Sequence, residues 1–155
     1  MLRKITIRKF VVLAGALNLL GGAAMAGPIT QDSQAAAKYF ENKIAFEANP
    51  MSIKDVLDGK TQNAVIIDVR AKKDYEAGHI KDAINIPYDE HKGFEGDEKE
   101  FAGLTKGAMH YVYCYTLACA LGPKACKKFA ELGYAVKEVV GGFKGLEDAK
   151  LPVEK

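Results

Sequence analysis

The stretch YVYCYTLACA at residues 111–120 is the most informative part of the chain. A short apolar, β-prone segment ends at Cys114, a few small or polar residues follow, and a helical pattern begins near Pro123. This order predicts a strand, a tight loop and a helix N-terminus, with a thiol where the strand ends. Ligands of open α/β sheets bind at that edge, where backbone N–H groups and the positive end of a helix hold anions. The same field lowers a cysteine pKa, so the pattern predicts a nucleophilic thiolate at Cys114. The alternative, which is the commoner one for a lone cysteine, is a buried thiol that packs as a small apolar side chain.

Strand-like and helix-like segments alternate along the rest of the chain. The continuous apolar run at 64–69 predicts a strand buried on both faces. Further strands are expected at 44–47, 83–86, 109–113 and 136–140. Helices are expected at 33–43, 53–57 (capped by Ser52), 72–77, 123–132 and after 141–142, with loop at 89–96 and a helical turn at 99–104. Strands that alternate with helices on short connections predict an α/β fold, a parallel sheet with helices on both faces.

The first 26 residues have the pattern of a secretory signal peptide. An apolar core at 10–20 is followed by Ala24-Met25-Ala26, and the basic residues before the core are Arg3, Lys4, Arg8 and Lys9. We expect cleavage after Ala26, a single mature domain at 27–155 and export to the bacterial periplasm. The apolar core is short for an uncleaved membrane anchor.

The charge balance changes once this segment is removed. The full chain of 155 residues carries a formal net charge of +2, with 22 Lys and Arg against 20 Asp and Glu. Without the four basic residues of the signal, 18 bases against 20 acids leave −2. No basic stripe suggests nucleic acid, and no further segment predicts a membrane span. No His/Cys spacing resembles a zinc site, so neither a metal nor another cofactor is expected.

Three ordered motifs resemble the rhodanese-homology domain family, across nearly all of the mature chain. IDVR at 67–70 is similar to the family's strand ending in D-x-R. DYEAGHIKDAINIP at 74–87 resembles E-Y-x-x-G-H-I-x-G-A-x-N-I-P, with Asp82 where the family usually has glycine. GGF at 141–143, with LPVE at 151–154, resembles the closing G-G-W…P-V segment.

The resemblance implies a rhodanese-like five-stranded parallel sheet and a sulfurtransferase that carries a persulfide on Cys114. Such an anion needs several N–H donors, which a loop around the cysteine supplies. The expected substrate-binding loop is Tyr115, Thr116, Leu117, Ala118, Cys119 and Ala120. Asp68 and Arg70 are expected to support it as an ion pair or a turn cap. The expected partners are a persulfide, polysulfide or thiosulfate donor and a thiol or cyanide-like acceptor, which includes a protein thiol.

The loop also departs from the family. Many members carry an arginine five positions after the cysteine, and Cys119 stands there in this chain. Dianionic thiosulfate is therefore expected to be a poorer donor than persulfides or polysulfides, although Lys124 could partly replace the missing cation.

Three functional readings follow from the cysteines. The leading one is an exported sulfurtransferase, in which Cys119 fills the loop with its side chain pointing outward. In the second, Cys119 is a resolving thiol and the protein is a thiol–disulfide redox protein; the third is a non-catalytic rhodanese-like binding module. Cys126 is expected to be buried and inert, and three cysteines leave at least one unpaired within a monomer.

Overall fold

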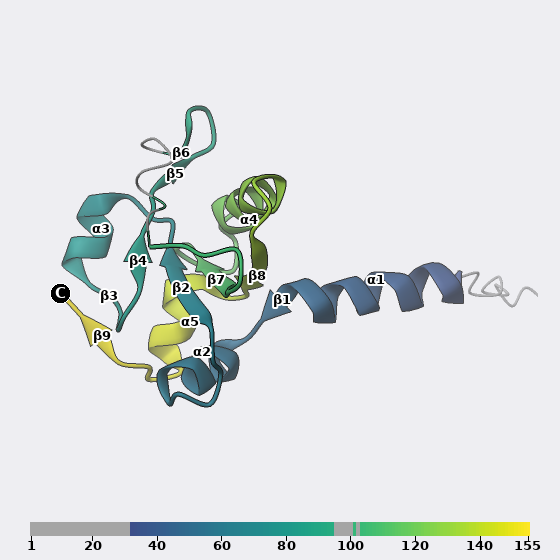
Figure 1. Cartoon of the computed structure of the whole chain (residues 1–155), viewed down its shortest axis with the longest axis horizontal. Coiled ribbons are helices and arrows are strands. Elements are labelled where there is room, and N and C mark those ends of the chain that lie inside the picture. Colours follow the sequence, from purple (N-terminus) through teal and green to yellow (C-terminus); the bar gives the residue numbers. More distant parts are fainter. Residues whose placement is uncertain (1–31, 95–100, 102) are drawn as a thin grey trace, which may run out of the picture. The chain divides into compact units, whose positions relative to one another are not determined.

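A five-stranded parallel sheet forms the centre of the computed structural model, which describes residues 32–94, 101 and 103–155 (Figure 1). The strands in spatial order are β1 (Glu47–Ala48), β8 (Ala135–Val139), β7 (Met109–Tyr113), β2 (Ala64–Asp68) and β4 (Ile84–Asn85). Every neighbouring pair is parallel, and β7 lies in the middle of the sheet. The predicted α/β fold and its five-stranded parallel sheet are confirmed.

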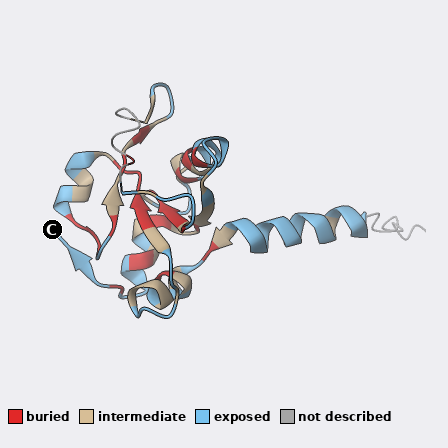
Figure 2. Ribbon diagram, viewed as in Figure 1, coloured by how far each residue is buried: buried red, intermediate tan, exposed pale blue. Residues whose placement is uncertain are grey.

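Helices cover both faces of this sheet. Residues of α2 (Pro50–Leu57), α3 (Lys72–Ala77) and α5 (Gly142–Asp148) pack in one core cluster, and residues of α4 (Leu121–Glu131) pack in the other; α1 (Ser33–Phe46) has no buried residue. Successive strand residues point to opposite faces, so Ile66 packs in a cluster with residues of α2 and α5, whereas Ile67 packs with residues of α4. The sheet is the most deeply buried part of the fold (Figure 2). Cys114 belongs to the cluster under α4.

The helix boundaries differ from the prediction in three places. Residues 44–46 continue α1, so the strand predicted at 44–47 is wrong and β1 begins only at Glu47. Asn49, not Ser52, caps α2: its side chain accepts from the Ser52 amide at 3.1 Å, and Pro50 occupies the first turn, where no N–H is needed. Helix α4 begins at Leu121, before Pro123.

Two short antiparallel pairs were not predicted. One joins β3 (His79–Ile80) to β9 (Val153–Glu154), and the other joins β5 (Tyr88–Asp89) to β6 (Gly93–Phe94). The second pair lies within the stretch predicted as loop. Residues 99, 100 and 102 of the predicted helical turn at 99–104 lie outside the described residues, as does the whole predicted signal segment.

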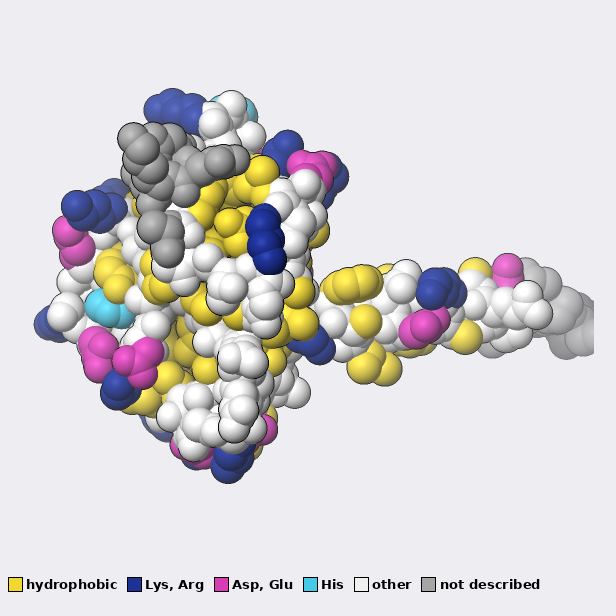
Figure 3. All heavy atoms as spheres, in the orientation of Figure 1, with side chains coloured by type: hydrophobic (Ala, Val, Ile, Leu, Met, Phe, Trp, Pro, Cys, Tyr) yellow, Lys and Arg dark blue, Asp and Glu magenta, His cyan; other side chains and the backbone are white. Residues whose placement is uncertain are grey.

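Helix α1 carries an unusually apolar exposed surface. Its exposed large apolar residues are Tyr39, Phe40, Ile44 and Phe46, and Figure 3 shows hydrophobic side chains along this helix. Within the described ranges, no helix is long and apolar enough to cross a membrane.

Candidate active site

Cys114 directly follows the last residue of β7 and is only 3% exposed. The chain then turns, with the Cys119 amide donating to the Thr116 carbonyl at 3.0 Å, and enters α4 at Leu121. The strand, loop and helix predicted around Cys114 are therefore present. The exposed residues of the loop are Thr116, Leu117, Ala118 and Ala120. None of the side chains from 115 to 120 is charged.

The sulfur of Cys114 lies in a buried and uncharged environment. Its thiol donates to the Cys119 carbonyl at 3.7 Å, and the amides of Gly122 and Tyr115 are directed at the sulfur. Burial, together with the neighbouring Cys119 thiol, raises the pKa of Cys114 to about 12, although the two amides act in the opposite direction. The predicted lowering of this pKa is wrong, because the amides are too few to offset desolvation in a loop without a cation.

Cys119 is half-buried and packs against the same apolar cluster as Cys114. Its predicted outward orientation is wrong. Burial opposes ionisation of Cys119, but the Cys114 thiol and the amides of Tyr115, Leu121 and Gly122 outweigh burial and lower its pKa. Two of these amides also face Cys114, so the same loop amides act on the pKa of both thiols.

The N-terminus of α5 holds the loop in place through its backbone. The amides of Phe143 and Lys144 donate to the carbonyls of Cys114 and Tyr115 at 2.8 and 3.0 Å. Gly142 has a φ of +60°, and a Cβ added there would lie 2.8 Å from the Cys114 carbonyl oxygen and from the Thr116 nitrogen. The glycine pair noted in the sequence therefore permits close contact between two backbones, a role that the motif alone did not indicate.

Asp68 and Arg70 form a buried ion pair at the end of β2. The Arg70 Nη2–Asp68 Oδ2 distance is 2.7 Å, and the two side chains are 5% and 0% exposed. Arg70 Nη2 also donates to the Gly78 carbonyl at 2.7 Å, and the guanidinium lies 3.8 Å from the centre of the Phe143 ring. The pair is one of the two arrangements expected from the sequence, and it connects β2 to α5 beneath the loop.

Comparison with known proteins agrees with this architecture. Residues 52–149 match the rhodanese-like domain family. The chain belongs to this family. The rhodanese-like domain is similar to the BH2092 protein of Bacillus halodurans, whose crystal structure has a TM-score of 0.70 at 28% identity over 79% of this chain and 86% of that one.

Two further relatives are similar over only part of their own length. Thiosulfate sulfurtransferase from Pseudomonas aeruginosa has a TM-score of 0.56 at 22% identity, over 72% of this chain and 19% of that one, and shows the fold alone. The HTH-type transcriptional regulator Rv0324 of Mycobacterium tuberculosis is 33% identical over 90 residues, which are 58% of this chain and 37% of the regulator. The rhodanese-like chain thus spans little more than a third of that curated relative.

Among the described residues, Lys124, which the sequence offered in place of the missing arginine, is not free to serve the loop of this rhodanese-like domain. Lys124 pairs with Glu90 instead of turning to the loop. Glu138 of β8 lies on the other side of Gly122: a Cβ added to Gly122 would lie 3.3 Å from Glu138 Oε1 and 3.6 Å from Cys114 Sγ. Burial, and then the charge of Glu47, raise the Glu138 pKa. Sequence analysis missed Glu138, because only the register of β8 against β7 brings it beside Cys114.

The remaining predicted residues have structural positions. The Tyr115 hydroxyl donates to Asp74 Oδ2 at 2.7 Å, so this phenol points to α3 and only its backbone serves the loop. Nδ1 of His79 lies 3.0 Å from the Tyr75 carbonyl oxygen, so this ring contacts the backbone of α3. Cys126 is half-buried on α4, and burial raises its pKa to about 12. Among the residues that the structure describes, no cluster of His, Cys, Asp or Glu could hold a metal ion.

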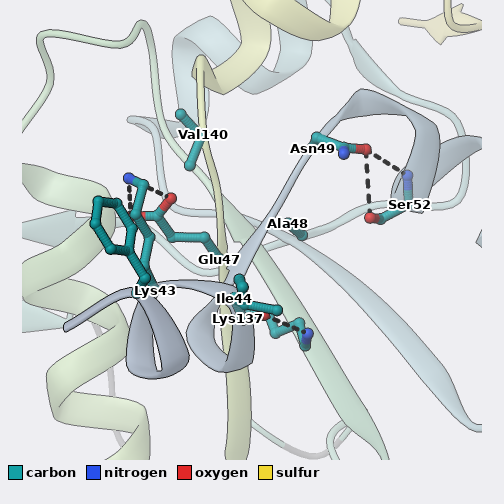
Figure 4. A pocket seen from close by; sticks show the side chains of 9 residues that line it. Lys43, Ile44, Glu47, Ala48, Asn49, Ser52, Lys137 and Val140 are labelled. Atoms are coloured by element: carbon teal, nitrogen blue, oxygen red, sulfur yellow. Dashed lines mark hydrogen bonds and ion pairs between the residues drawn. The ribbon is translucent and has the colours of Figure 1, made fainter. Parts of the chain in front are cut away.

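A separate pocket of about 640 Å³ lies where α1 meets β1 and β8 (Figure 4). Lys43 pairs with Glu47 at 2.7 Å along its wall, and Lys137 donates to the Ile44 carbonyl at 3.4 Å. The residues that line it include neither cysteine nor histidine, so the pocket offers no group for sulfur chemistry.

Proposed function

We propose that this rhodanese-like domain is a sulfurtransferase that moves sulfane sulfur through a persulfide on Cys114. The observation that carries the proposal is the position of Cys114 between the end of β7 and the N-terminus of α4, with the amides of Tyr115 and Gly122 at its sulfur. Ala120 supplies no side-chain cap to α4, so first-turn amides are left to hold an anion.

The reaction takes place in two displacements. The Cys114 thiolate attacks the sulfane sulfur of a donor, the donor's own sulfur bond breaks, and the electron pair leaves with the donor fragment. The outer sulfur of the resulting persulfide carries the negative charge toward the loop amides. An acceptor thiolate or cyanide then attacks that outer sulfur, and Cys114 leaves as a thiolate.

The donors that fit this loop are persulfides and polysulfides. Thiosulfate carries two negative charges, which cations hold better than neutral amides do. Residues 115–120 have no cation, Lys124 is paired with Glu90, and the acidic Glu138 lies beside Gly122. Each of these features disfavours a dianion relative to a persulfide.

Replacement of individual cysteines tests the proposed function. Cys114→Ser is expected to abolish sulfur uptake and transfer, whereas Cys126→Ser is expected to retain both, because Cys126 lies within α4, outside the loop. Intact-mass spectrometry after exposure to glutathione persulfide measures uptake, and transfer to cyanide measures turnover. Uptake that survives in Cys114→Ser would place the sulfur on another thiol. A wild-type protein that neither gains sulfur nor releases sulfide would support the non-catalytic binding module instead.

We also propose that residues 1–26 are a signal peptide, that 27–155 form the mature domain, and that the protein acts in the periplasm. The basic, apolar and A-x-A segments of the first 26 residues support this proposal. N-terminal sequencing of protein from the native host should find Gly27 at or near the first position. Cytoplasmic protein that retains Met1 would contradict it.

A further inference from the structure

We infer that Cys119 is a resolving thiol, so that this protein can release the sulfur of its persulfide as sulfide and pass the resulting disulfide to a dithiol. The inference rests on the proposed persulfide at Cys114. The persulfide sulfur then has a second route, in which it leaves as sulfide and a dithiol is finally oxidised to a disulfide.

The orientation of Cys119 is the first support. The neighbouring side chains from 116 to 118 are exposed, with Leu117 at 77%, as expected where a loop turns its side chains outward. Cys119 is the exception, because it packs into the cluster that contains Cys114. Its carbonyl also accepts the Cys114 thiol at 3.7 Å, so the backbone and side chain of one residue both adjoin the same sulfur.

The ionisation of the two thiols is consistent with this assignment. They are close enough to influence each other's pKa, and the loop amides favour the charge on Cys119. A thiolate is the attacking species in thiol–disulfide exchange. Once Cys114 holds a persulfide, Cys119 is the adjacent group able to attack it.

The step balances without an external oxidant. The Cys119 thiolate attacks Cys114 Sγ, the bond from Sγ to the outer sulfur breaks, and the outer sulfur leaves with the electron pair as sulfide, which takes up a proton. The sulfane sulfur is reduced to sulfide and the two cysteines are oxidised to a Cys114–Cys119 disulfide. A dithiol then reduces that disulfide by exchange and is itself oxidised to a disulfide.

Exposure determines which sulfur the dithiol attacks. Cys114 is 3% exposed, whereas Cys119 is half-buried at the end of the exposed turn that begins at Thr116. The incoming thiolate therefore reaches Cys119, forms a mixed disulfide there, and releases Cys114 as the thiolate that begins the next cycle.

The experiment loads each protein with equimolar glutathione persulfide, without reductant and without oxygen. Intact mass, released sulfide and non-reducing peptide maps are measured for wild type, Cys119→Ala, Cys119→Ser and Cys126→Ser. Trypsin leaves Cys114 and Cys119 in one peptide, because residues 107–123 contain no Lys or Arg. Chymotryptic cleavage after Tyr115 or Leu117 separates them, so that only a disulfide holds the two fragments together.

Wild type and Cys126→Ser are expected to release sulfide, lose two hydrogens and yield the cross-linked fragments. Both Cys119 variants are expected to gain one sulfur, retain it, and lose the release of sulfide until an external thiol is added. Wild-type protein that retains its persulfide as long as Cys119→Ala would overturn the inference while leaving the proposed function intact. Failure of wild type and of both Cys119 variants to take up sulfur would instead remove the proposed function.

Discussion

Arg70 illustrates how a motif residue can serve a site without facing its ligand. Its guanidinium is neutralised by Asp68, bonded to the Gly78 carbonyl, and covered by the Phe143 ring. With its charge and donors used in this way, Arg70 stabilises the strand end and the α5 contact that hold the loop. Its removal would leave Asp68 charged, buried and unpaired.

We expect Arg70→Met to lower the free energy of unfolding by about 3–5 kcal/mol, the usual cost of breaking a buried ion pair. The double variant Asp68→Asn/Arg70→Met should recover part of that loss, since no buried charge remains. The exposed pair Lys72–Glu76, 3.8 Å apart, provides the control, and Lys72→Met should cost less than about 1 kcal/mol. Urea unfolding measures all three, and equal losses for Arg70→Met and Lys72→Met would contradict the structural role.

The Cys126 thiol predicts a pH dependence of stability. Its pKa rises from 9.0 to about 12 in the folded protein, because burial disfavours the thiolate. The folded state therefore keeps a proton that the unfolded state loses. This contribution to stability is complete below pH 9.0 and is lost as the pH rises toward about 12.

The test compares wild type with Cys126→Ala in urea, at neutral pH and between pH 9.0 and about 12. Groups that both proteins share cancel in this comparison. The wild type should lose more unfolding free energy than the variant as the pH rises. Parallel losses would show that Cys126 ionises normally in the folded protein.

At the scale of the element, α5 and the Cys114 loop depend on each other through Gly142. An alanine there meets both a left-handed backbone and the loop backbone at 2.8 Å. Gly142→Ala should cost about 1–2 kcal/mol for backbone strain and about 1–3 kcal/mol for overpacking. It should also slow sulfur uptake by Cys114, because the loop must move.

Gly59→Ala is the matched control for this prediction. Gly59 has a φ of +73°, but no atom lies within 4 Å of an added Cβ. It should therefore show only the strain of about 1–2 kcal/mol, with normal sulfur uptake. Equal effects of the two substitutions on unfolding and uptake would mean that the close contact at Gly142 has no role.

Local patterns were sufficient to predict the elements that have strong local signals. The apolar run of β2 and the strand–loop–helix around Cys114 appeared where expected, since the apolar patterns that mark them extend over only a few neighbouring residues. Residues 44–46 were misassigned because an isoleucine and a phenylalanine favour a strand, whereas these residues continue the helical backbone of α1, which ends with the Glu47 amide donating to the Lys43 carbonyl. Strands β3 and β9 pair residues far apart in the chain, which no local pattern encodes.

The candidate site also contains residues that local patterns identify and residues that only contacts between distant parts of the chain bring together. Cys114, Asp68 and Arg70 stand at strand ends, and strand ends can be recognised in a sequence. The inward orientation of Cys119 depends on how one turn closes, and the proximity of Glu138 depends on sheet register. Neither is encoded in residue spacing, so both required the three-dimensional structure.

At the scale of the whole molecule, charge should determine the choice of donor. In competition at equal concentrations, glutathione persulfide or polysulfide should load Cys114 faster than thiosulfate, because the loop opposes a dianion with neutral amides. Glu138→Gln removes the carboxylate beside Gly122 and should reduce the preference for persulfide over thiosulfate. Glu41→Gln, a remote substitution on the exposed face of α1, should leave that preference unchanged. Mass spectrometry of the loaded protein measures the ratio, and faster loading from thiosulfate would contradict the prediction.

The contact between α5 and the Cys114 loop also imposes an order on biogenesis. Translation delivers Cys114, Cys119 and Cys126 before the amides of Phe143 and Lys144 that hold the loop carbonyls. Until that last helix is present, no α5 amide accompanies the carbonyls of Cys114 and Tyr115, and the loop lacks these two contacts. A chain that has not yet added α5 therefore contains all three thiols but not the helix that holds the Cys114 loop.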